Sequence, residues 1–394
     1  MRLHEFQAKE LLSRYGIPIP PARVVDDAAG ARRAAERLGC ARYAVKAQIL
    51  AGNRLDSGAI RFAASPDGVG ATAEELIGET FTGDNSRFGG EKVRWLLIEK
   101  AVAAVQQVYA AIVLDGSAGA LTLLTSRVAG TGITERIAAS PELLHQTPIR
   151  LGAEGPEADF QRAAEAIELR GKVAAEAARI FREMARLAVE LDAPLVEINP
   201  LAITATGDVR ALDAKLLLDD NALFRHPALA AFGEALEMED GDPLELAADR
   251  HHVNYAALDG DVGVVANGAG LALATLDMIR DAGCRPANFM DIRTTAQSLD
   301  IAYGMGLVLN NPRVRTVVVN VHGGGMQRCD TIAEGITVAM RRAPRRVPLI
   351  VRLAGNNADF ARTRLAGSGV EFTEAADMAD AMAKLVAVLK SAVA

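Results

Sequence analysis

Three residues with oxygen-bearing side chains lie in two neighbouring segments near the middle of the chain. Glu197 and Asn199 belong to VEINPL (196–201), and Asp213 belongs to ALDAKL (211–216). Carboxylate and amide oxygens are the ligands that Mg²⁺ prefers, and Mg²⁺ neutralises the β- and γ-phosphates when ATP activates a carboxylate. Asn-Pro and Asp are also common in turns, so the spacing alone leaves a metal site and a turn both open.

Lys46 is the only charged residue in the apolar segment 43–49, which is predicted as a strand. A lysine in such a strand can act as a point charge on a phosphate group. The alternative is a surface lysine whose aliphatic chain packs along apolar residues while its ammonium group stays in water. The apolar neighbours of Lys46 favour the phosphate-binding role over this alternative. Glu99 ends the predicted strand 95–99 and would by itself be an unremarkable acid.

The elements that must position these residues follow from hydrophobic spacing. The first half mixes helices with short strands, which predicts an α+β region with antiparallel strands. Asp27 is a predicted N-cap, and the helical stretch 163–191 is expected to break near Gly171. Further predicted helices are 28–38 and one that ends near 15–16; further predicted strands are 108–114, 121–124, 195–198 and 209–212, the last two around a turn at 206–208.

The second half repeats a simpler unit of strand, glycine-rich turn and helix. Predicted strands at 262–266 and 316–321 run into the turns 267–270 and 323–325, and a third strand is predicted at 349–353. This rhythm is typical of a doubly wound parallel sheet. Ligands of such sheets bind at the carboxyl ends of the strands, which is where both turns are expected.

Composition limits the class of protein. A chain of 394 residues is too long for one core, so two or three domains are expected, with the acidic segment 232–247 as their linker. The formal charge of -7 argues against a nucleic-acid partner, which usually needs a basic face. The N-terminus reads as an amphipathic helix rather than a signal peptide, and no apolar run is long enough to span a membrane. Three scattered cysteines, without paired spacing, fit a reducing cytoplasm: Cys40, Cys284 and Cys329.

Several longer motifs carry a family resemblance along nearly the whole chain. They are LHEFQAKELLSRYGIPIP (3–20), VEINPL and ALDAKL, DDNALFR (219–225), NYAALDGDVGVVANGAGLALATLDMI (254–279), RCDTIAEGI (328–336) and VPLIVRLAGNN (347–357). Their order and spacing closely resemble the β subunits of succinyl-CoA synthetase and of malate–CoA ligase. The resemblance implies an ATP-grasp region at 1–235 with a small subdomain at about 21–103. A linker at 236–248 and a flavodoxin-like domain at 249–394 would follow.

The resemblance also assigns roles to residues. Lys46, Arg54, Glu99, Val102 and Gln107 match positions that bind ATP or GTP. Asn199 and Asp213 match the Mg²⁺ ligands. The substrate carboxylate would be held by Asn267 and the glycines Gly323, Gly324 and Gly325.

The resemblance further implies an incomplete catalyst. No catalytic residue is expected in this chain, because the phosphohistidine and the CoA site of such ligases belong to an α subunit. The expected reaction joins a carboxylic acid to CoA through an acyl phosphate, with ATP converted to ADP and phosphate. The expected assembly is a heterodimer or heterotetramer in the cytoplasm.

Departures from the family pattern keep two alternatives open. The family's H-A-G-G-R-G-K-A-G-G reads LAGNRLDSGA at 50–59, with Asn53, Leu55 and Asp56 in place of two glycines and a lysine. A glutamate of the family is Gln107 here. These changes favour a repurposed, non-catalytic paralogue with weakened nucleotide binding. In the second half the chain gains Arg293 and His322, and the loop 320–330 is one residue longer than usual, which favours malate or another substituted dicarboxylate over succinate.

Overall fold

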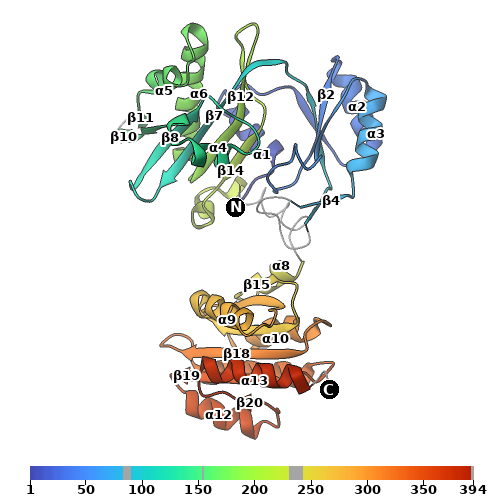
Figure 1. Ribbon diagram of the computed structural model, residues 1–394, viewed down its shortest axis with the longest axis vertical. Coiled ribbons are helices and arrows are strands. Elements are labelled where there is room, and N and C mark those ends of the chain that lie inside the picture. The colour runs from blue at the N-terminus through green and yellow to red at the C-terminus, as the bar shows by residue number, and fades with distance from the viewer. Residues whose placement is uncertain (83–89, 153–154, 230–242, 392–394) are drawn as a thin grey trace. The chain divides into compact units, whose positions relative to one another are not determined.

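The computed structural model describes residues 1–82, 90–152, 155–229 and 243–391 of the chain (Figure 1). It contains two compact units, Met1–Gly233 and Glu234–Ala394, which are described here one at a time. Most of the linker predicted at 236–248 lies outside the described residues, so the domain boundaries stay a prediction. Among the described helices, none combines the length and the apolar character needed to cross a membrane.

The larger lobe of the first unit is built on a six-stranded antiparallel sheet. The strand order is β13-β12-β7-β8-β9, with β14 also paired to β12. All of these pairs are antiparallel, as the sequence predicts for this region. The strands are β7 (Ala104–Asp115), β8 (Ala120–Ser126), β9 (Leu144–Pro148), β12 (Leu195–Thr204), β13 (Val209–Ala211) and β14 (Ala214–Leu217).

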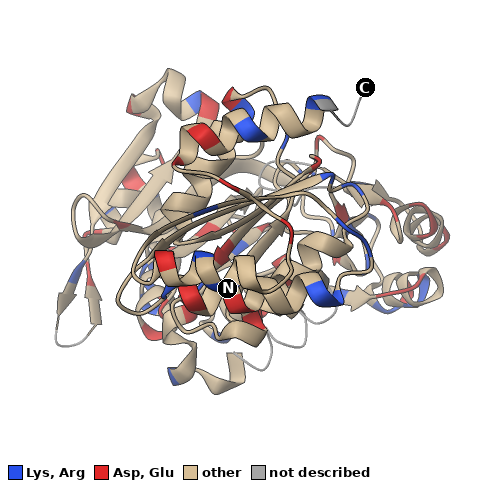
Figure 2. Cartoon of the chain, turned by 90° about the horizontal axis from the view of Figure 1, so that it is seen from below, with Lys and Arg blue, Asp and Glu red and all other residues tan. Residues whose placement is uncertain are grey.

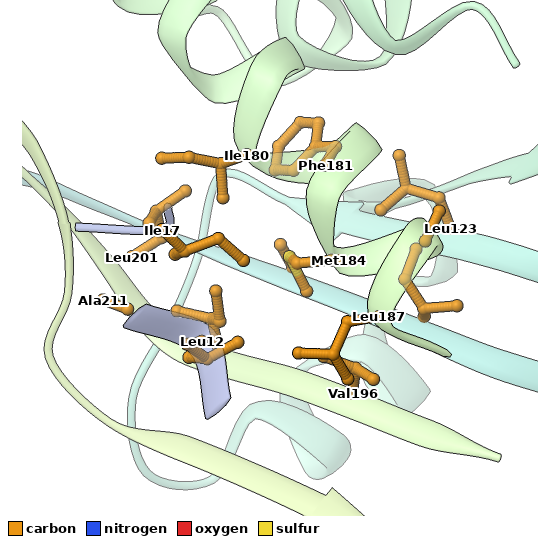
Figure 3. Close-up of a cluster of buried hydrophobic side chains, with 14 of the residues drawn as sticks. Leu12, Ile17, Leu123, Ile180, Phe181, Met184, Leu187, Val196, Leu201 and Ala211 are labelled. Atoms are coloured by element: carbon orange, nitrogen blue, oxygen red, sulfur yellow. The ribbon is translucent and has the colours of Figure 1, made fainter. Parts of the chain in front are cut away.

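Helix α6 (Gly171–Glu190) covers this sheet because one of its faces is apolar. Ile180, Phe181, Met184 and Leu187 recur at three- to four-residue spacing and pack on side chains of the strands (Figure 3). The predicted break in the helical stretch is confirmed, since α5 (Phe160–Ala166) ends before α6 begins at Gly171. The same lobe holds α1 (Glu5–Arg14), α4 (Ile133–Ala139), η1 (Pro141–Leu143), η2 (Asp220–Arg225), β10 (Arg150–Gly152) and β11 (Gly155–Glu157).

The smaller lobe of the first unit has its own sheet and core. The sheet runs β1-β6-β2-β3, and helices α2 (Ala28–Leu38) and α3 (Pro66–Leu76) contribute to its core. Helix α2 has the predicted bounds, and the Asp27 side chain caps it by accepting a hydrogen bond from the backbone N–H of Gly30. The strands of this sheet are β1 (Ala22–Val25), β2 (Tyr43–Ala47), β3 (Ile60–Ala63) and β6 (Leu96–Lys100), while β4 (Thr80–Phe81) and β5 (Glu91–Lys92) pair only with each other.

The second unit is a doubly wound sheet with an added edge strand. Its order is β15-β17-β16-β18-β19-β20, and every pair is parallel except β15 with β17. Two separate apolar cores lie on its two faces, which confirms the predicted architecture. The strands are β15 (Val253–Ala257), β16 (Val262–Asn267), β17 (Asn288–Ile292), β18 (Thr316–Gly323), β19 (Leu349–Gly355) and β20 (Thr373–Glu374).

Helices of the second unit divide between those two cores. Helices α10 (Ser298–Asn310), α11 (Cys329–Arg342) and α12 (Ala358–Gly367) contribute to one core, and α9 (Ala269–Asp281) and α13 (Met378–Ser391) contribute to the other. A short helix, α8 (Pro243–Asp249), precedes β15. In the view of Figure 2, Lys and Arg residues are interspersed with Asp and Glu residues.

Candidate functional site

A cavity in the first unit collects the predicted nucleotide and metal residues. Its volume is about 490 Å³, and its wall is formed by both lobes of the unit. Lys46 and Arg54 come from the smaller lobe, whereas Asn199 and Asp213 come from the larger one. All seven residues predicted for the nucleotide and for Mg²⁺ line this cavity: Lys46, Arg54, Glu99, Val102, Gln107, Asn199 and Asp213.

Lys46 is buried, which rules out the alternative of a surface lysine. It lies in the fully buried strand β2, and 5% of its surface is exposed. Its ammonium lies 2.9 Å from Oε1 of Glu99 and 2.8 Å from Oε1 of Glu5, and it donates to the Leu212 carbonyl at 2.6 Å. Three acceptors therefore already surround the three N–H groups of Lys46.

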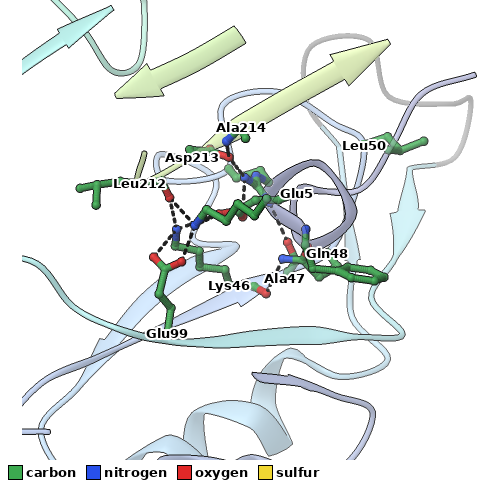
Figure 4. Close-up of polar contacts among 12 residues, drawn as sticks. Glu5, Lys46, Ala47, Gln48, Leu50, Glu99, Leu212, Asp213 and Ala214 are labelled. Carbon is green, nitrogen blue, oxygen red and sulfur yellow. Dashed lines mark hydrogen bonds and ion pairs between the residues drawn. The ribbon is translucent and has the colours of Figure 1, made fainter. Parts of the chain in front are cut away.

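Two residues that the sequence did not assign, Glu5 and Lys9, complete this arrangement. Figure 4 shows Glu5 close to Lys46. The Lys9 ammonium contacts Oε1 of Glu5 at 2.8 Å, the Leu212 carbonyl at 2.7 Å and Oε2 of Glu99. A signal was present in the sequence, because Glu5 and Lys9 are an i,i+4 charge pair on a helix that also carries buried apolar residues. The name ion cluster is used below for Glu5, Lys9, Lys46, Arg54, Glu99 and Asp213.

The ion cluster is electrically balanced. Its three cations, Lys9, Lys46 and Arg54, face three carboxylates, so the formal charges cancel. Burial opposes ionisation of Glu5, but the positive charges of Lys46, Lys9 and Arg54 outweigh it and hold the pKa of Glu5 well below its usual value. Burial also opposes the charge of Lys46, and Glu5 and Glu99 reverse that effect and raise its pKa. Glu5 and Lys46 are therefore both charged at neutral pH.

Asn199 and Asp213 lie side by side where strands β12 and β14 meet. The Asn199 backbone N–H donates to the Asp213 carbonyl at 3.2 Å, and the Asn199 Oδ1 accepts from the Gly130 N–H at 2.6 Å. Oδ1 of Asp213 accepts from Arg54 Nη2 at 2.6 Å and from the Ala214 N–H at 2.8 Å. The donor set is oxygen from one amide and one carboxylate, which fits a hard divalent cation.

Two protein ligands would leave a cation dependent on other oxygens. Within residues 1–82, 90–152, 155–229 and 243–391, no group of three or more His, Cys, Asp or Glu side chains is arranged to hold a metal. Mg²⁺ commonly uses one or two carboxylates together with water and substrate phosphates. The pair Asn199 and Asp213 therefore suits a cation that arrives with a nucleotide.

Glu197 lines the same cavity, opposite Lys215 on β14 and Ala111 on β7. Burial raises the pKa of Glu197; Asp213 adds to that rise, while Lys215 and Asn199 counteract it. Burial, together with the charge of Glu197, also raises the pKa of Tyr109. A carboxyl group whose pKa is raised by its surroundings inside a cavity is common at functional sites.

The altered loop at 50–59 keeps a backbone feature of glycine. Asn53 has a φ of 56°, in the left-handed region that favours glycine and that asparagine tolerates better than most residues. Leu55 and Asp56 are exposed, and Arg54 between them and Asn53 points inward to the ion cluster. The asparagine at position 53 therefore preserves the backbone conformation of the turn.

Gln107, which replaces a glutamate of the family, is exposed and lies on the cavity wall.

In the second unit, Asn267 and the three glycines lie at the carboxyl ends of the neighbouring strands β16 and β18. The Asn267 amide exchanges two hydrogen bonds with the His322 backbone, both at 2.8 Å. Gly323 is packed tightly, since a Cβ there would lie 2.6 Å from the Asn356 carbonyl oxygen, whereas Gly324 and Gly325 face open space. The structure brings these four residues together and leaves their role in substrate binding a prediction.

Arg293, which we interpreted as a sign of a different acid, is engaged within the fold. Its Nε and Nη2 donate to Oδ1 of Asn254 at 2.8 and 2.6 Å, and Nη2 also contacts Asp249. These bonds tie the end of β17 to β15 and α8. The gained arginine therefore has a structural explanation that does not require a changed substrate.

Comparisons with known proteins match both units. A family model described as an ATP-grasp domain matches residues 2–203, and one described as CoA-ligase matches residues 265–386. The chain is 37% identical over 391 residues to the succinate–CoA ligase [ADP-forming] subunit beta of Bacillus subtilis, covering 99% of this chain and 100% of that protein. It is 38% identical over 392 residues to the subunit of the same name from Staphylococcus aureus strain JH9, covering 100% of both.

A solved structure supports the fold. ATP citrate lyase from Methanothrix soehngenii, in complex with citrate and coenzyme A, superimposes with a TM-score of 0.70 over 99% of both chains at 17% identity. At that identity the likeness concerns the arrangement of the elements and not the chemistry.

Proposed function

Because this chain belongs to the succinate–CoA ligase β-subunit family, we propose that it serves as the β subunit of an ADP-forming acid–CoA ligase. The observation that carries the proposal is the cavity of the first unit, where both cations and both oxygen ligands expected for a magnesium–nucleotide complex meet. The acid is a succinate-like dicarboxylate, and the nucleotide is ATP or GTP.

Different residues of the cavity bind different parts of the nucleotide. Lys46 and Arg54 bind the phosphates, Glu99, Val102 and Gln107 bind the nucleoside side, and Asn199 and Asp213 hold Mg²⁺. When bound, Mg²⁺ neutralises phosphate charge, so that the terminal phosphoryl group can be transferred. Because Lys46 is also paired with Glu99, and Arg54 with Asp213, nucleotide binding requires these two pairs to rearrange.

The second unit holds the acid. The amide of Asn267 fixes the β18 terminus, and the turn of Gly323, Gly324 and Gly325 follows it, before α11. The Gly324 N–H donates to the Gln327 carbonyl at 2.9 Å, so this bond has to open if the turn is to bind a carboxylate or a phosphoryl group through all of its backbone N–H groups. Phosphorylation turns a poor leaving oxygen of the acid into a good one. An α subunit contributes the phosphohistidine and the CoA site, and the ligase works as a heteromer.

Calorimetry with Mg-ATP tests the nucleotide assignment. We expect magnesium-dependent binding that Asp213→Asn weakens at least about tenfold, because the loss of a charged metal ligand costs on the order of 1.4 kcal/mol or more. The matched control is Asp208→Asn, the same change at an exposed residue of the turn between β12 and β13, which should bind like the wild type. Equal binding by both variants would remove Asp213 from the site.

A non-catalytic paralogue with weak nucleotide binding is the second candidate. The balanced ion cluster favours it, since the cations of the cavity already have partners. Absence of binding at millimolar Mg-ATP, with and without an α subunit, would support this candidate. If binding is found, a panel of succinate, malate and other dicarboxylates with the α subunit would identify the acid.

A further inference from the structure

Glu5 lies at the centre of the ion cluster. Its Oε1 lies 2.8 Å from both the Lys9 and the Lys46 ammonium groups, and its Oε2 lies 2.8 Å from Arg54 Nη2. Its side chain is 1% exposed, compared with 30% for Asp213, the other carboxylate that contacts Arg54. One buried carboxylate thus contacts all three cations of the cluster.

The position of Glu5 is fixed by the chain on either side of it. The Leu3 N–H donates to the Leu216 carbonyl at 3.1 Å, which anchors the segment to β14 of the larger lobe. The Phe6 N–H donates to Oε1 of Gln48 at 3.0 Å, which anchors it to the smaller lobe directly after β2. Glu5 lies between these anchors, so it has little freedom to move when a ligand enters.

Asp213 is placed differently. It is partly exposed to the cavity, and the two hydrogen bonds described for its side chain both fall on Oδ1. Nη2 of Arg54 lies 2.6 Å from Oδ1 of Asp213 and 2.8 Å from Oε2 of Glu5, so the two carboxylates share this nitrogen. Because Asp213 is the more exposed of the two and opens to the cavity, it can exchange Arg54 for another cation, and the buried Glu5 remains as the fixed counter-charge.

We propose that Glu5 is a positioning residue for nucleotide phosphates, whose fixed carboxylate keeps Lys46 and Arg54 on the cavity wall when Asp213 turns to the metal. This inference rests on the proposed nucleotide site. Without Glu5, the cations Lys9, Lys46 and Arg54 would repel one another and would retain only Glu99 and Asp213 as counter-charges. Their long side chains would then have to be ordered by the nucleotide itself, at a cost in affinity.

Two simpler roles for Glu5 make different predictions. If Glu5 only stabilises the fold, Glu5→Gln lowers the thermal midpoint, and the folded fraction binds nucleotides as before. If Glu5 only supplies negative charge, Glu5→Gln changes the formal charge of the cluster from zero to one positive charge and strengthens the binding of polyphosphates. A positioning role predicts weaker binding in spite of this more favourable charge.

The test compares Mg-ATP and AMP binding by calorimetry in the full chain. We expect Glu5→Gln to weaken Mg-ATP about tenfold or more, the effect of a lost charge-assisted contact, and to change AMP binding less than about twofold. Glu10→Gln is the matched control, because it makes the same change on the same helix at an exposed residue paired with Arg14. Glu5→Asp keeps the charge but shortens the reach, and it should give an intermediate loss for Mg-ATP.

A nucleotide-free measurement separates this inference from the proposed function. The ¹⁵N-labelled Nη2–H groups of Arg54, identified by their absence in Arg54→Gln, should exchange slowly with solvent in the wild type, because Nη2 contacts both Glu5 and Asp213. They should exchange at least about tenfold faster in Glu5→Gln, as expected for an arginine that loses one fixed partner. Unchanged exchange, or unchanged or tighter Mg-ATP binding by a folded Glu5→Gln, would overturn the positioning role. If Glu5→Gln does not fold, the same comparisons with Glu5→Asp decide. If the wild type binds no Mg-ATP, the proposed function fails, and the exchange result still decides whether Glu5 holds Arg54.

Discussion

At the scale of single residues, the cavity contains carboxylates in opposite electrostatic settings. Glu5 is surrounded by cations that lower its pKa, whereas burial raises the pKa of Glu197 and only Lys215 and Asn199 counteract it. An acid whose pKa is raised by folding destabilises the protein once it ionises. The fold tolerates Glu197 at a cost, which favours a role in function rather than in stability.

This cost predicts a pH-dependent gain in stability for Glu197→Gln. Below the ordinary pKa near 4.5 the residue is protonated in the folded and unfolded states alike, so the substitution has little effect. As the pH rises through and above that value, the unfolded chain loses its proton more readily than the folded protein, and wild-type stability falls relative to the variant. Urea unfolding between pH 4 and pH 8 should show a difference that grows with pH and then levels off.

The control for this prediction is Glu10→Gln, which removes an exposed carboxylate of the same kind. Its effect on the urea midpoint should stay small across the series, because exposed ion pairs contribute little to stability. A Glu197→Gln variant that is less stable than the wild type at pH 8 would show that contacts of the ionised carboxylate outweigh its burial.

At the scale of elements, local signals were predicted well and distant pairings were not. Helix α2 has its predicted bounds because Asp27 caps it from the adjacent residue. The strand predicted at 43–49 ends earlier, at Ala47, where its pairing with β6 stops. The antiparallel edge strand β15 was not predicted, since only its pairing with β17 defines it.

The candidate site divides in the same way. Residues carried by short motifs, such as Asn199 and Asp213, were predicted and lie on one cavity wall. Glu5 and Lys9 were not, because their partners Lys46 and Glu99 are 41 and 90 residues away in the sequence. The ion pairs that already occupy Lys46 could not be predicted for the same reason.

The three glycines at the end of β18 and in the turn after it were predicted as one group, but the structure predicts different effects of substituting them. A Cβ on Gly323 would lie 2.6 Å from the Asn356 carbonyl oxygen and 2.8 Å from Cys329 Sγ, whereas a Cβ on Gly324 meets nothing within 4 Å. Gly323→Ala should therefore lower the free energy of unfolding by about 1–3 kcal/mol through overpacking. Gly324→Ala, the matched control, should stay within about 0.5 kcal/mol, as surface changes usually do.

Urea unfolding of the two variants checks this difference. Equal stability of Gly323→Ala and Gly324→Ala would mean that the β18–β19 terminus opens readily, which would weaken the argument that it presents a rigid binding surface. A loss confined to Gly323→Ala would separate the glycine required for packing from Gly324, which has open space beside it.

At the scale of the whole molecule, each unit has its own apolar cores. Phe181 is fully buried in a core made only of residues from the first unit, and Met305 is fully buried in a core made only of residues from the second. Because the residues of each core come from one unit, we expect scanning calorimetry to resolve two unfolding transitions. Mg-ATP should raise only the transition of the first unit, since a ligand stabilises the structure that binds it.

A matched pair of core substitutions assigns these transitions. Phe181→Ala should destabilise the first unit by about 3–5 kcal/mol, and Met305→Ala should destabilise the second by about 2–5 kcal/mol, through the cavities they create. The transition lowered by Phe181→Ala should be the one that Mg-ATP raises, and Met305→Ala should leave it in place. If both substitutions and the nucleotide instead moved a single common transition, the two units would unfold as one cooperative structure, and nucleotide binding to the first would stabilise the acid-binding unit as well.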